Sequence, residues 1–280
     1  MKIGVIGGTG LYGLSGLTQL SEIQPDTPWG PASSPLMCGR LGDTDVVFVA
    51  RHGIGHRFLP TEVPYRANVF ALKAAGCSHV LSVSAVGSLQ EAYAPGDVVV
   101  VDQFIDRTRS RVSTFFGKGV VAHVAFGEPL CGYLRGVVVD AAREVGAPVH
   151  NGGTYVCMEG PAFSTRAESR LYRSWGGDVI GMTNVTEAKL AREAGLSYAT
   201  LAFVTDYDAW REGHDSVTAE EIMAVLGRNV STARGILAAA IPRVSGPSRY
   251  ASVLESSLMT DDSQLNESTR RWLDVLRGRG

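Results

Sequence analysis

The chain has 280 residues, enough for one large α/β domain or two smaller ones. Its 26 Lys and Arg nearly balance 28 Asp and Glu, and the formal net charge of −2 excludes a strongly basic nucleic-acid-binding protein. Hydrophobic residues make up 45% of the chain, too many for a disordered protein. No uninterrupted apolar run is long enough for a transmembrane helix, so we expect no contact with a membrane.

The cysteines and histidines give no sign of a disulfide framework or a metal site. None of the four cysteines forms a C-x-x-C pair, which predicts reduced thiols in a cytoplasmic protein. His52 and His56 are four residues apart, but no H-E-x-x-H motif occurs, so we expect no structural zinc.

Hydrophobic spacing and turn residues predict alternating strands and helices. In chain order they are a strand at 3–6, a hairpin of strands at 36–41 and 46–50, a helix at 66–75, strands at 79–84 and 98–102, a helix at 130–145, a strand at 154–157, a helix at 164–175, a strand at 179–181, a helix at 186–194, a strand at 198–205 and a helix from Thr218 to about 240. Thr165 and Glu168 have the spacing of a capping box at the start of one helix.

This alternation predicts an α/β protein with a parallel or mixed sheet and helices on both faces. Ile241-Pro242 interrupts the pattern, and the residues that follow, up to 262, are polar and rich in serine. A last amphipathic helix is predicted over 265–276. We therefore expect a single α/β domain over 1–242, followed by a linker and a C-terminal helix over 243–280.

A glycine-rich loop follows the first strand. Gly8-Thr9-Gly10-Leu11-Tyr12-Gly13 matches G-x-G-x-x-G, but a dinucleotide site also needs an immediate helix and an acidic residue about 20 positions on. Several glycines and prolines occupy that stretch instead. A plain tight turn is one alternative. We favour a loop whose backbone N–H groups and Thr9 hydroxyl hold a phosphate.

Three further strand ends carry groups suited to an anion. Arg51-His52-Gly53 follows the strand at 46–50, and Arg offers a planar fork that matches phosphate oxygens. Ser82-Val83-Ser84-Ala85-Val86-Gly87-Ser88 is a turn of small residues, and Gly181-Met182-Thr183-Asn184 opens a helix. Each has a purely structural alternative, but together they predict an anion site at one edge of the sheet.

Two aspartates follow the last strand. Asp206 and Asp208 are two residues apart, so in an extended segment both carboxyl groups would face one pocket. Such a pair can keep one proton, and then donates to one heteroatom and accepts from another. The N7 and N6 edge of adenine complements that pattern. A divalent metal site and solvated turn residues are the alternatives.

Motifs in the same order along residues 2–242 resemble those of the trimeric 5′-methylthioadenosine phosphorylases of the purine nucleoside phosphorylase superfamily. The segments that carry the resemblance are Ile6-Gly7-Gly8-Thr9-Gly10-Leu11, Ala50-Arg51-His52-Gly53, Pro64-Tyr65-Arg66-Ala67-Asn68, Ser84-Ala85-Val86-Gly87-Ser88-Leu89, Asp102-Gln103-Phe104-Ile105-Asp106-Arg107-Thr108, the run from Gly153 to Thr165, Gly181-Met182-Thr183-Asn184 and Thr205-Asp206-Tyr207-Asp208-Ala209-Trp210. The resemblance implies one domain with a central mixed, partly barrel-like sheet flanked by helices. It also implies phosphorolysis of 5′-methylthioadenosine to adenine and 5-methylthioribose 1-phosphate.

The resemblance also implies roles for individual residues. Phosphate, as a co-substrate, would be held by Thr9, Arg51, His52, Ser84, Ala85 and Thr183. The nucleoside would contact Phe163 at the base, Met182 at the ribose, and Tyr207, Ile222, Asp206 and Asp208, with Asp206 as general acid. His123 would reach the 5′ pocket of a neighbouring subunit in a homotrimer or a dimer of trimers. No cofactor or metal is implied.

The resemblance also bears on specificity at four positions. It implies that Ser164 and the aspartate pair favour a 6-aminopurine over a 6-oxopurine. Ala219 stands where the family commonly has Val, which predicts a wider pocket for the 5′ substituent. The alternatives are a broader nucleoside phosphorylase acting on adenosine or methylthioinosine, a nucleoside hydrolase, and a module that binds adenine nucleosides without catalysis.

Overall fold

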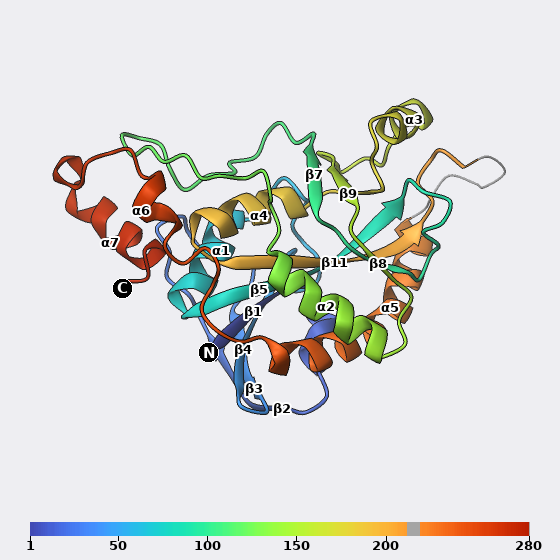
Figure 1. The fold of residues 1–280 in the computed structure, drawn as a ribbon, viewed down its shortest axis with the longest axis horizontal. Helices are drawn as coiled ribbons and strands as arrows, with labels where there is room; N and C mark the ends of the chain where they lie inside the picture. Colours follow the sequence, from blue (N-terminus) through green and yellow to red (C-terminus); the bar gives the residue numbers. More distant parts are fainter. Residues whose placement is uncertain (212–218, 280) are drawn as a thin grey trace.

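The computed structural model describes residues 1–211 and 219–279 (Figure 1). Within them the strands form one mixed sheet, and the path β2-β3-β4-β1-β5-β10-β9-β7 runs through most of it. The strands are β1 (Lys2–Gly7), β2 (Leu17–Ile23), β3 (Leu36–Leu41), β4 (Thr44–Ala50), β5 (Cys77–Ser88), β6 (Val98–Val100), β7 (Gln103–Asp106), β8 (Val149–Asn151), β9 (Thr154–Cys157), β10 (Val179–Gly181) and β11 (Ser197–Asp206).

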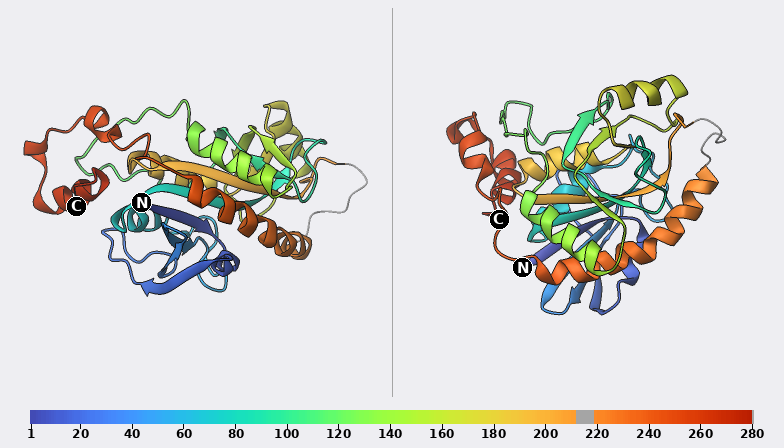
Figure 2. Two further views of the ribbon diagram at one scale, coloured as in Figure 1. Left: turned by 60° about the horizontal axis from the view of Figure 1, so that its bottom comes forward. Right: turned by 45° about the vertical axis from the view of Figure 1, so that its right-hand side comes forward.

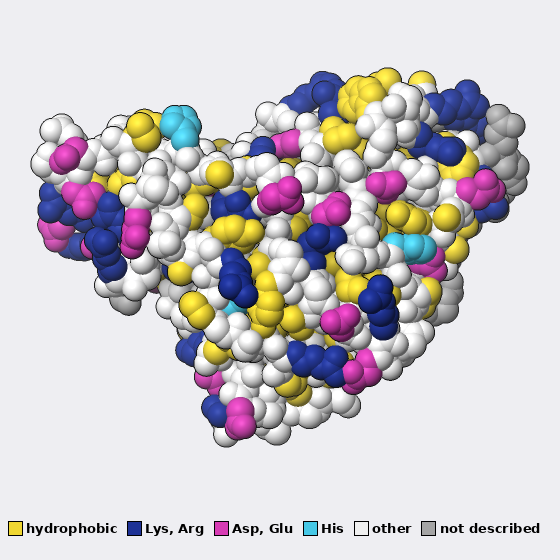
Figure 3. Space-filling model, viewed as in Figure 1, with side chains coloured by type: hydrophobic (Ala, Val, Ile, Leu, Met, Phe, Trp, Pro, Cys, Tyr) yellow, Lys and Arg dark blue, Asp and Glu magenta, His cyan; other side chains and the backbone are white. Residues whose placement is uncertain are grey.

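Helices cover both faces of this sheet, as predicted (Figure 2). The α-helices are α1 (Tyr65–Ala74), α2 (Gly132–Glu144), α3 (Arg166–Ser174), α4 (Asn184–Glu193), α5 (Ala219–Ala240), α6 (Val253–Ser257) and α7 (Glu267–Leu276). Short 3-10 helices occur at Thr9–Gly13, Ile241–Arg243 and Asp262–Gln264. No helix in the described part of the chain is both long and apolar enough to cross a membrane. Basic and acidic side chains intermingle on the face seen in Figure 3.

The sheet branches at β5, which pairs in parallel with both β1 and β11 and antiparallel with β10. One branch ends in β9 and β7, and the other in β6 and β8. The chain passes from β6 to β7 and from β8 to β9, so the branches are joined. Hydrogen bonds from Gly152 N to Val100 O (3.0 Å) and from Asp102 N to Gly153 O (3.1 Å) link these crossings. This closure is the predicted partly barrel-like character.

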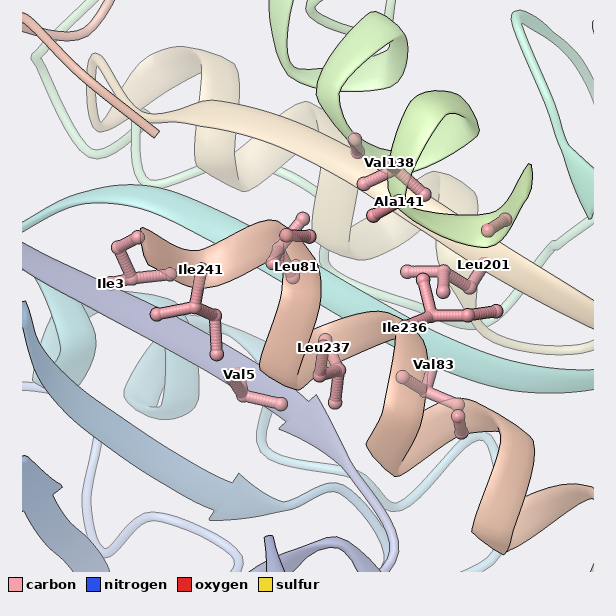
Figure 4. Close-up of a cluster of buried hydrophobic side chains, with 14 of the residues drawn as sticks. Ile3, Val5, Leu81, Val83, Val138, Ala141, Leu201, Ile236, Leu237 and Ile241 are labelled. Atoms are coloured by element: carbon pink, nitrogen blue, oxygen red, sulfur yellow. The ribbon is translucent and has the colours of Figure 1, made fainter. Parts of the chain in front are cut away.

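Two hydrophobic clusters lie on opposite faces of the central strands. Along β1, Ile3 and Val5 belong to one cluster and Ile6 to the other, as the alternation of side chains along a strand requires. The first cluster packs β1, β5 and β11 against α2 and α5, and Figure 4 shows Val138 from α2 and Ile236 and Leu237 from α5 among its side chains. The second packs the sheet against α1, α4 and α7.

Most predicted elements are present, with shifted ends. The strand predicted at 79–84 extends over Cys77–Ser88, and the helix predicted at 186–194 begins at Asn184. The capping box of α3 is confirmed, with Thr165 and Glu168 exchanging hydrogen bonds. Three strands were not predicted: β2, β7 and β8. The cap predicted at Thr218 lies outside the described residues.

The segment after Pro242 packs against the rest of the chain. Leu273 and Leu276 of α7 are buried, and the Trp272 ring lies 5.5 Å from that of Trp29 (centroid to centroid). The predicted linker contains α6 and a bridge between Leu258 and Ala122. In Figure 1, α6 and α7 lie at one end of the molecule near α1 and α4. The division into domains at residue 242 stays a prediction.

Candidate active site

A cavity of about 450 Å³ opens where several strands of the sheet end. Strands β1, β4, β5 and β11 run in the same direction, so their carboxyl ends meet at this edge. The predicted site residues that line the cavity are Arg51, His52, Ser84, Ala85, Phe163, Met182, Thr183, Asp206 and Asp208. Most of the predicted site residues, which come from segments far apart in the chain, thus line one cavity.

Other predicted residues lie beside the cavity or away from it. Thr9 is not part of the lining, although Gly8 and Gly10 on either side of it are. Ser164 is buried behind the wall and donates to the sulfur of Met158 (3.7 Å). Tyr207 lies edge-on to Trp210 and does not line the cavity.

At the anion end of the cavity, Arg51 is fixed by a buried carboxylate. Nε donates to Glu187 Oε1 (2.5 Å) and Nη2 to Glu187 Oε2 (3.1 Å), and both side chains are almost fully buried. Burial alone would lower the pKa of Arg51, but the charge and hydrogen bonds of Glu187 raise it above its usual value. Arg51 is therefore a fixed cation whose charge is locally neutralised.

His52 is a neutral imidazole in this setting. Its Nδ1 lies 2.8 Å from the Phe58 carbonyl oxygen, which can only accept, so Nδ1 carries the proton. Burial and the nearby Arg51 charge lower the pKa of His52 to about 4. The ring stacks on His56 at 4.3 Å, and His56 also lines the cavity.

The start of α4 adds backbone donors to the same end. Thr183 is the N-cap and lines the cavity, so the first N–H groups of α4 lie beside it. Ser84 Oγ donates to Asn184 Oδ1 (2.9 Å), which joins β5 to this helix end. Gly181 permits the approach, because a Cβ there would lie 2.0 Å from the Tyr155 hydroxyl. Any larger residue at 181 would displace the turn into α4.

The aspartate pair lines the same cavity, but not through an extended segment as predicted. Asp208 has a φ of +49°, so the chain turns after β11. Asp206 Oδ1 accepts from Asp208 N (2.7 Å), and Oδ2 accepts from the Thr205 hydroxyl (2.7 Å). Asp208 Oδ2 is buried without a hydrogen-bond partner among the described residues, and burial raises the pKa of Asp208.

One wall of the cavity is apolar, and hydrogen bonds from the buried Arg111 side chain stabilise it. Met158, Pro161, Phe163 and Met182 line it, and the Phe163 ring is 46% exposed. Arg111 is buried and donates to the backbone carbonyl groups of Glu159 (2.5 Å) and Met182. This guanidinium joins two loops that form the wall. An exposed aromatic ring on such a wall is suited to stacking on a planar base.

His123 lies in a second hollow of about 300 Å³, separate from the main cavity. That hollow also contains Thr114, Lys189 and Glu193. Glu193 accepts from the Thr114 hydroxyl and from Phe115 N, both at 2.7 Å, and burial raises its pKa to about 7. Within one chain His123 does not reach the site.

Helix α5 closes the cavity with residues that the sequence did not indicate. Asn229, Val230 and Ala233 line it. Ala219 and Ile222 belong to α5, but their side chains lie outside the described part of the structure. No group of three or more His, Cys, Asp or Glu side chains that could hold a metal ion occurs among the residues that the structure describes.

The most important residue that sequence reasoning missed is Glu187. A glutamate in a helix normally faces solvent, and nothing in the local pattern marks this one as buried. The sequence did indicate Asn184, because it ends the Gly-Met-Thr-Asn turn at the start of α4. The spacing of His56 from His52 likewise indicated His56.

Comparison with known proteins shows the family to which the chain belongs. The model of the phosphorylase superfamily matches residues 2–242. The chain belongs to the phosphorylase superfamily. Two relatives of this phosphorylase, both named S-methyl-5′-thioadenosine phosphorylase, come from Thermosynechococcus vestitus and Geobacter sulfurreducens. The first is 54% identical, covering 98% of this chain and 97% of the relative, and the second is 50% identical, covering 99% and 98%.

Solved structures agree with this placement of the phosphorylase. A methylthioadenosine phosphorylase from an antarctic soil metagenomic library has a TM-score of 0.93 and 44% identity, covering 98% of both chains. An adenosine/methylthioadenosine phosphorylase variant from Schistosoma mansoni, solved in complex with methylthioadenosine, has a TM-score of 0.79 and 39% identity. It covers 87% of this phosphorylase and 91% of the Schistosoma chain.

Proposed function

We propose that this phosphorylase cleaves S-methyl-5′-thioadenosine with inorganic phosphate, giving adenine and 5-methylthioribose 1-phosphate. The observation that carries the proposal is one cavity lined both by the anion groups Arg51, Ser84 and Thr183 and by the carboxyl groups of Asp206 and Asp208. The names of relatives about 50% identical over the whole chain support the same activity.

The anion end provides the nucleophile. A phosphate oxygen forms a bond to ribose C1′ while the bond from C1′ to N9 of adenine breaks, and the ribose passes through a cation-like state. Phosphate held below C1′ stabilises that positive charge and is already oriented for attack. Arg51, His52, Ser84, Ala85 and Thr183 would hold it, with Thr9 from the neighbouring loop.

The aspartate end provides for the leaving group. Asp206 in its protonated form donates to N7 as the C1′–N9 bond breaks, and Asp208 accepts from the exocyclic N6 amine. Phosphate enters as HPO4²⁻, and the proton that it loses on bonding to C1′ returns through solvent to Asp206, so the general acid is restored and the net transfer is one proton from phosphate to adenine. Phe163 packs on the base and Met182 lies against the ribose. Ile222 and Ala219 of α5 would contact the 5′ substituent, while Ser164 and Tyr207 would act from outside the cavity lining, Ser164 through Met158 and Tyr207 through its neighbours Asp206 and Asp208.

The direct test is adenine release from methylthioadenosine and from adenosine, each with and without phosphate. We expect release only with phosphate, and faster from methylthioadenosine. Release without phosphate would indicate a hydrolase, and binding without release would indicate a non-catalytic module. Equal use of adenosine would indicate a broader phosphorylase and a pocket widened at Ala219.

We also propose that phosphate is the only additional small molecule needed, with no cofactor or metal. Overnight dialysis against a chelator is expected to leave the rate unchanged. A rate lost on chelation and recovered with one divalent ion would contradict this proposal.

A homotrimer would complete the site, because His123 lies outside the cavity of its own chain. In a trimer His123 would approach the 5′ substituent bound to a neighbouring subunit. Sedimentation velocity is expected to give three chains, or six for a dimer of trimers. His123→Ala is expected to raise KM for methylthioadenosine, whereas a monomer with full activity would refute the shared site.

A further inference from the structure

A fully buried polar network lies beneath the anion end of the cavity. It consists of Arg51, Ser82, Asn184, Glu187 and Tyr198, each of which is at most 5% exposed. Arg51 comes from the turn directly after β4, and the other four come from β5, β11 and α4. The network therefore joins four elements at the point where the anion site is built.

Glu187 is the centre of this network. Its two oxygens accept from Nε and Nη2 of Arg51, and Oε2 also accepts from the hydroxyl groups of Ser82 (3.0 Å) and Tyr198 (2.9 Å). A buried carboxylate with this many donors is fully satisfied. Its position is therefore strongly determined.

Arg51 has little freedom left. Besides the Glu187 fork, Nη1 donates to Val83 O (2.8 Å) and Nη2 to Ser82 Oγ (2.6 Å). A guanidinium has five N–H groups, so at most one remains for a ligand in the cavity. Its direction is fixed before any ligand arrives.

The network extends from Glu187 to a second anion-binding residue. Asn184 Nδ2 donates to Ser82 Oγ (3.0 Å) and to the Tyr198 hydroxyl (2.9 Å), while its Oδ1 accepts from Ser84 Oγ (2.9 Å). Ser84 lines the cavity, so the positions of both the Arg51 guanidinium and the Ser84 hydroxyl group depend on the same carboxylate.

We propose that Glu187 is the positioning residue of the phosphate site, orienting Arg51 directly and Ser84 through Ser82 and Asn184. It does not touch phosphate. The inference rests on the proposed function, since it assumes that the anion end receives phosphate. A donor held in place before binding loses no further conformational entropy when phosphate arrives, and this favours tight and correctly aligned binding.

The test is Glu187→Gln, which preserves size but removes the charge. One Gln oxygen can still accept, but its amide N–H groups then oppose those of Arg51. We expect KM for phosphate to rise about 10- to 100-fold, the range for a lost hydrogen bond to a charged group. We expect KM for methylthioadenosine to stay within about threefold of the wild-type value.

Thr186→Val is the matched control. Thr186 precedes Glu187 on the same helix and is fully buried, and its hydroxyl has no partner among the described residues. Both KM values should remain at wild-type levels in this variant. If Glu187→Gln does not fold, Ser82→Ala removes one link of the network with a smaller change, and KM for phosphate should again rise selectively.

The outcomes distinguish failure of the proposed function from failure of the positioning role of Glu187. A wild-type chain that releases no adenine with phosphate would refute the proposed function itself. An active wild type whose Glu187→Gln variant binds phosphate normally, more tightly, or with both KM values raised equally would refute the positioning role alone. Stabilisation of each variant by inorganic phosphate in thermal unfolding gives a readout that does not depend on catalysis.

Discussion

At the scale of single residues, the two aspartates have different surroundings although they are only two positions apart. Asp206 accepts a hydrogen bond on each oxygen, from the Thr205 hydroxyl and from Asp208 N. Asp208 is partly buried, its Oδ2 has no hydrogen-bond partner within the described part of the chain, and burial raises its pKa. The pair can therefore share one proton, and N7 of a bound purine would draw it toward Asp206.

Asp206→Asn tests that role. The amide retains the size of the side chain but cannot transfer a proton, so turnover of methylthioadenosine should fall about 10²- to 10⁴-fold. Phosphate should still bind, as measured by its stabilisation of the variant in thermal unfolding. An unchanged turnover number would rule out Asp206 as the general acid.

Glu193 gives a prediction about pH. Burial raises its pKa from 4.5 to about 7, so the folded chain keeps a proton that the unfolded chain has lost between these values. The free energy of unfolding should therefore fall as pH rises from about 4.5 to about 7, by up to about 3 kcal/mol from this residue.

Glu193→Gln should remove that contribution. Urea unfolding of the wild type and the variant at pH 5 and pH 8 measures it, since the stability of the wild type relative to the variant should decline with rising pH. A constant difference across this range would show that Glu193 ionises normally in the folded chain.

At the scale of elements, the turn from β10 into α4 determines the anion end. The sequence predicted α4 from residue 186, but the helix begins at Asn184, and this places its first N–H groups beside the cavity. The close contact between Gly181 and the ring of Tyr155 from the neighbouring strand β9 makes this arrangement possible.

Gly181→Ala is expected to abolish activity while much of the fold survives. Its Cβ would lie 2.0 Å from the hydroxyl oxygen of Tyr155 and 2.6 Å from Cζ, so the β10 to α4 turn must shift. Gly136→Ala on α2 is the control, because a Cβ there meets nothing within 4 Å and alanine favours a helix by about 1 kcal/mol. Steady-state rates and melting temperatures of both variants test the expectation.

Sequence patterns were informative where burial was strong. Strands buried on both faces, such as β5 and β11, produce long apolar runs, and the capping box of α3 has a specific spacing. Strand β2 lies at an exposed edge and has almost no buried residue, so its sequence lacks the buried apolar face from which a strand is predicted. Strands β7 and β8 have few residues and depend on pairing with distant partners, which no local pattern can show.

In the candidate site, too, local patterns did not predict residues whose positions depend on tertiary packing. Strand-end motifs identified Arg51, Ser84 and Thr183, because each follows or belongs to a recognisable apolar run. Glu187 was not identifiable, since its burial depends on how α4 packs on the sheet. The turn at Asp208 was also missed, because a left-handed φ at an aspartate is decided by tertiary contacts.

At the scale of the whole molecule, the C-terminal segment is attached through an aromatic cluster. The Trp29 ring contacts those of Phe70 (5.1 Å), Phe115 (4.8 Å) and Trp272 (5.5 Å), joining the N-terminal region, α1, the segment before α2 and α7. The superfamily match ends at residue 242, but the packing continues beyond it.

Leu273→Ala tests how strongly this segment contributes to stability. Leu273 is fully buried, so its truncation should reduce the free energy of unfolding by about 2–5 kcal/mol. KM for phosphate should not change, because α7 does not line the cavity. A loss below about 0.5 kcal/mol would show that α7 folds back only weakly.

The branching of the sheet at β5 has a consequence for local opening of the chain. Strands β1, β10 and β11 all take hydrogen bonds from this one strand. Each of its central amides is bonded to a strand of one branch and can exchange with solvent only when that buried branch separates from β5, whereas those of the exposed edge strand β2 can exchange by fraying. Deuterium uptake should therefore be slowest in β5 and report the global unfolding free energy there, so the strand that carries Ser84 is also the last to open.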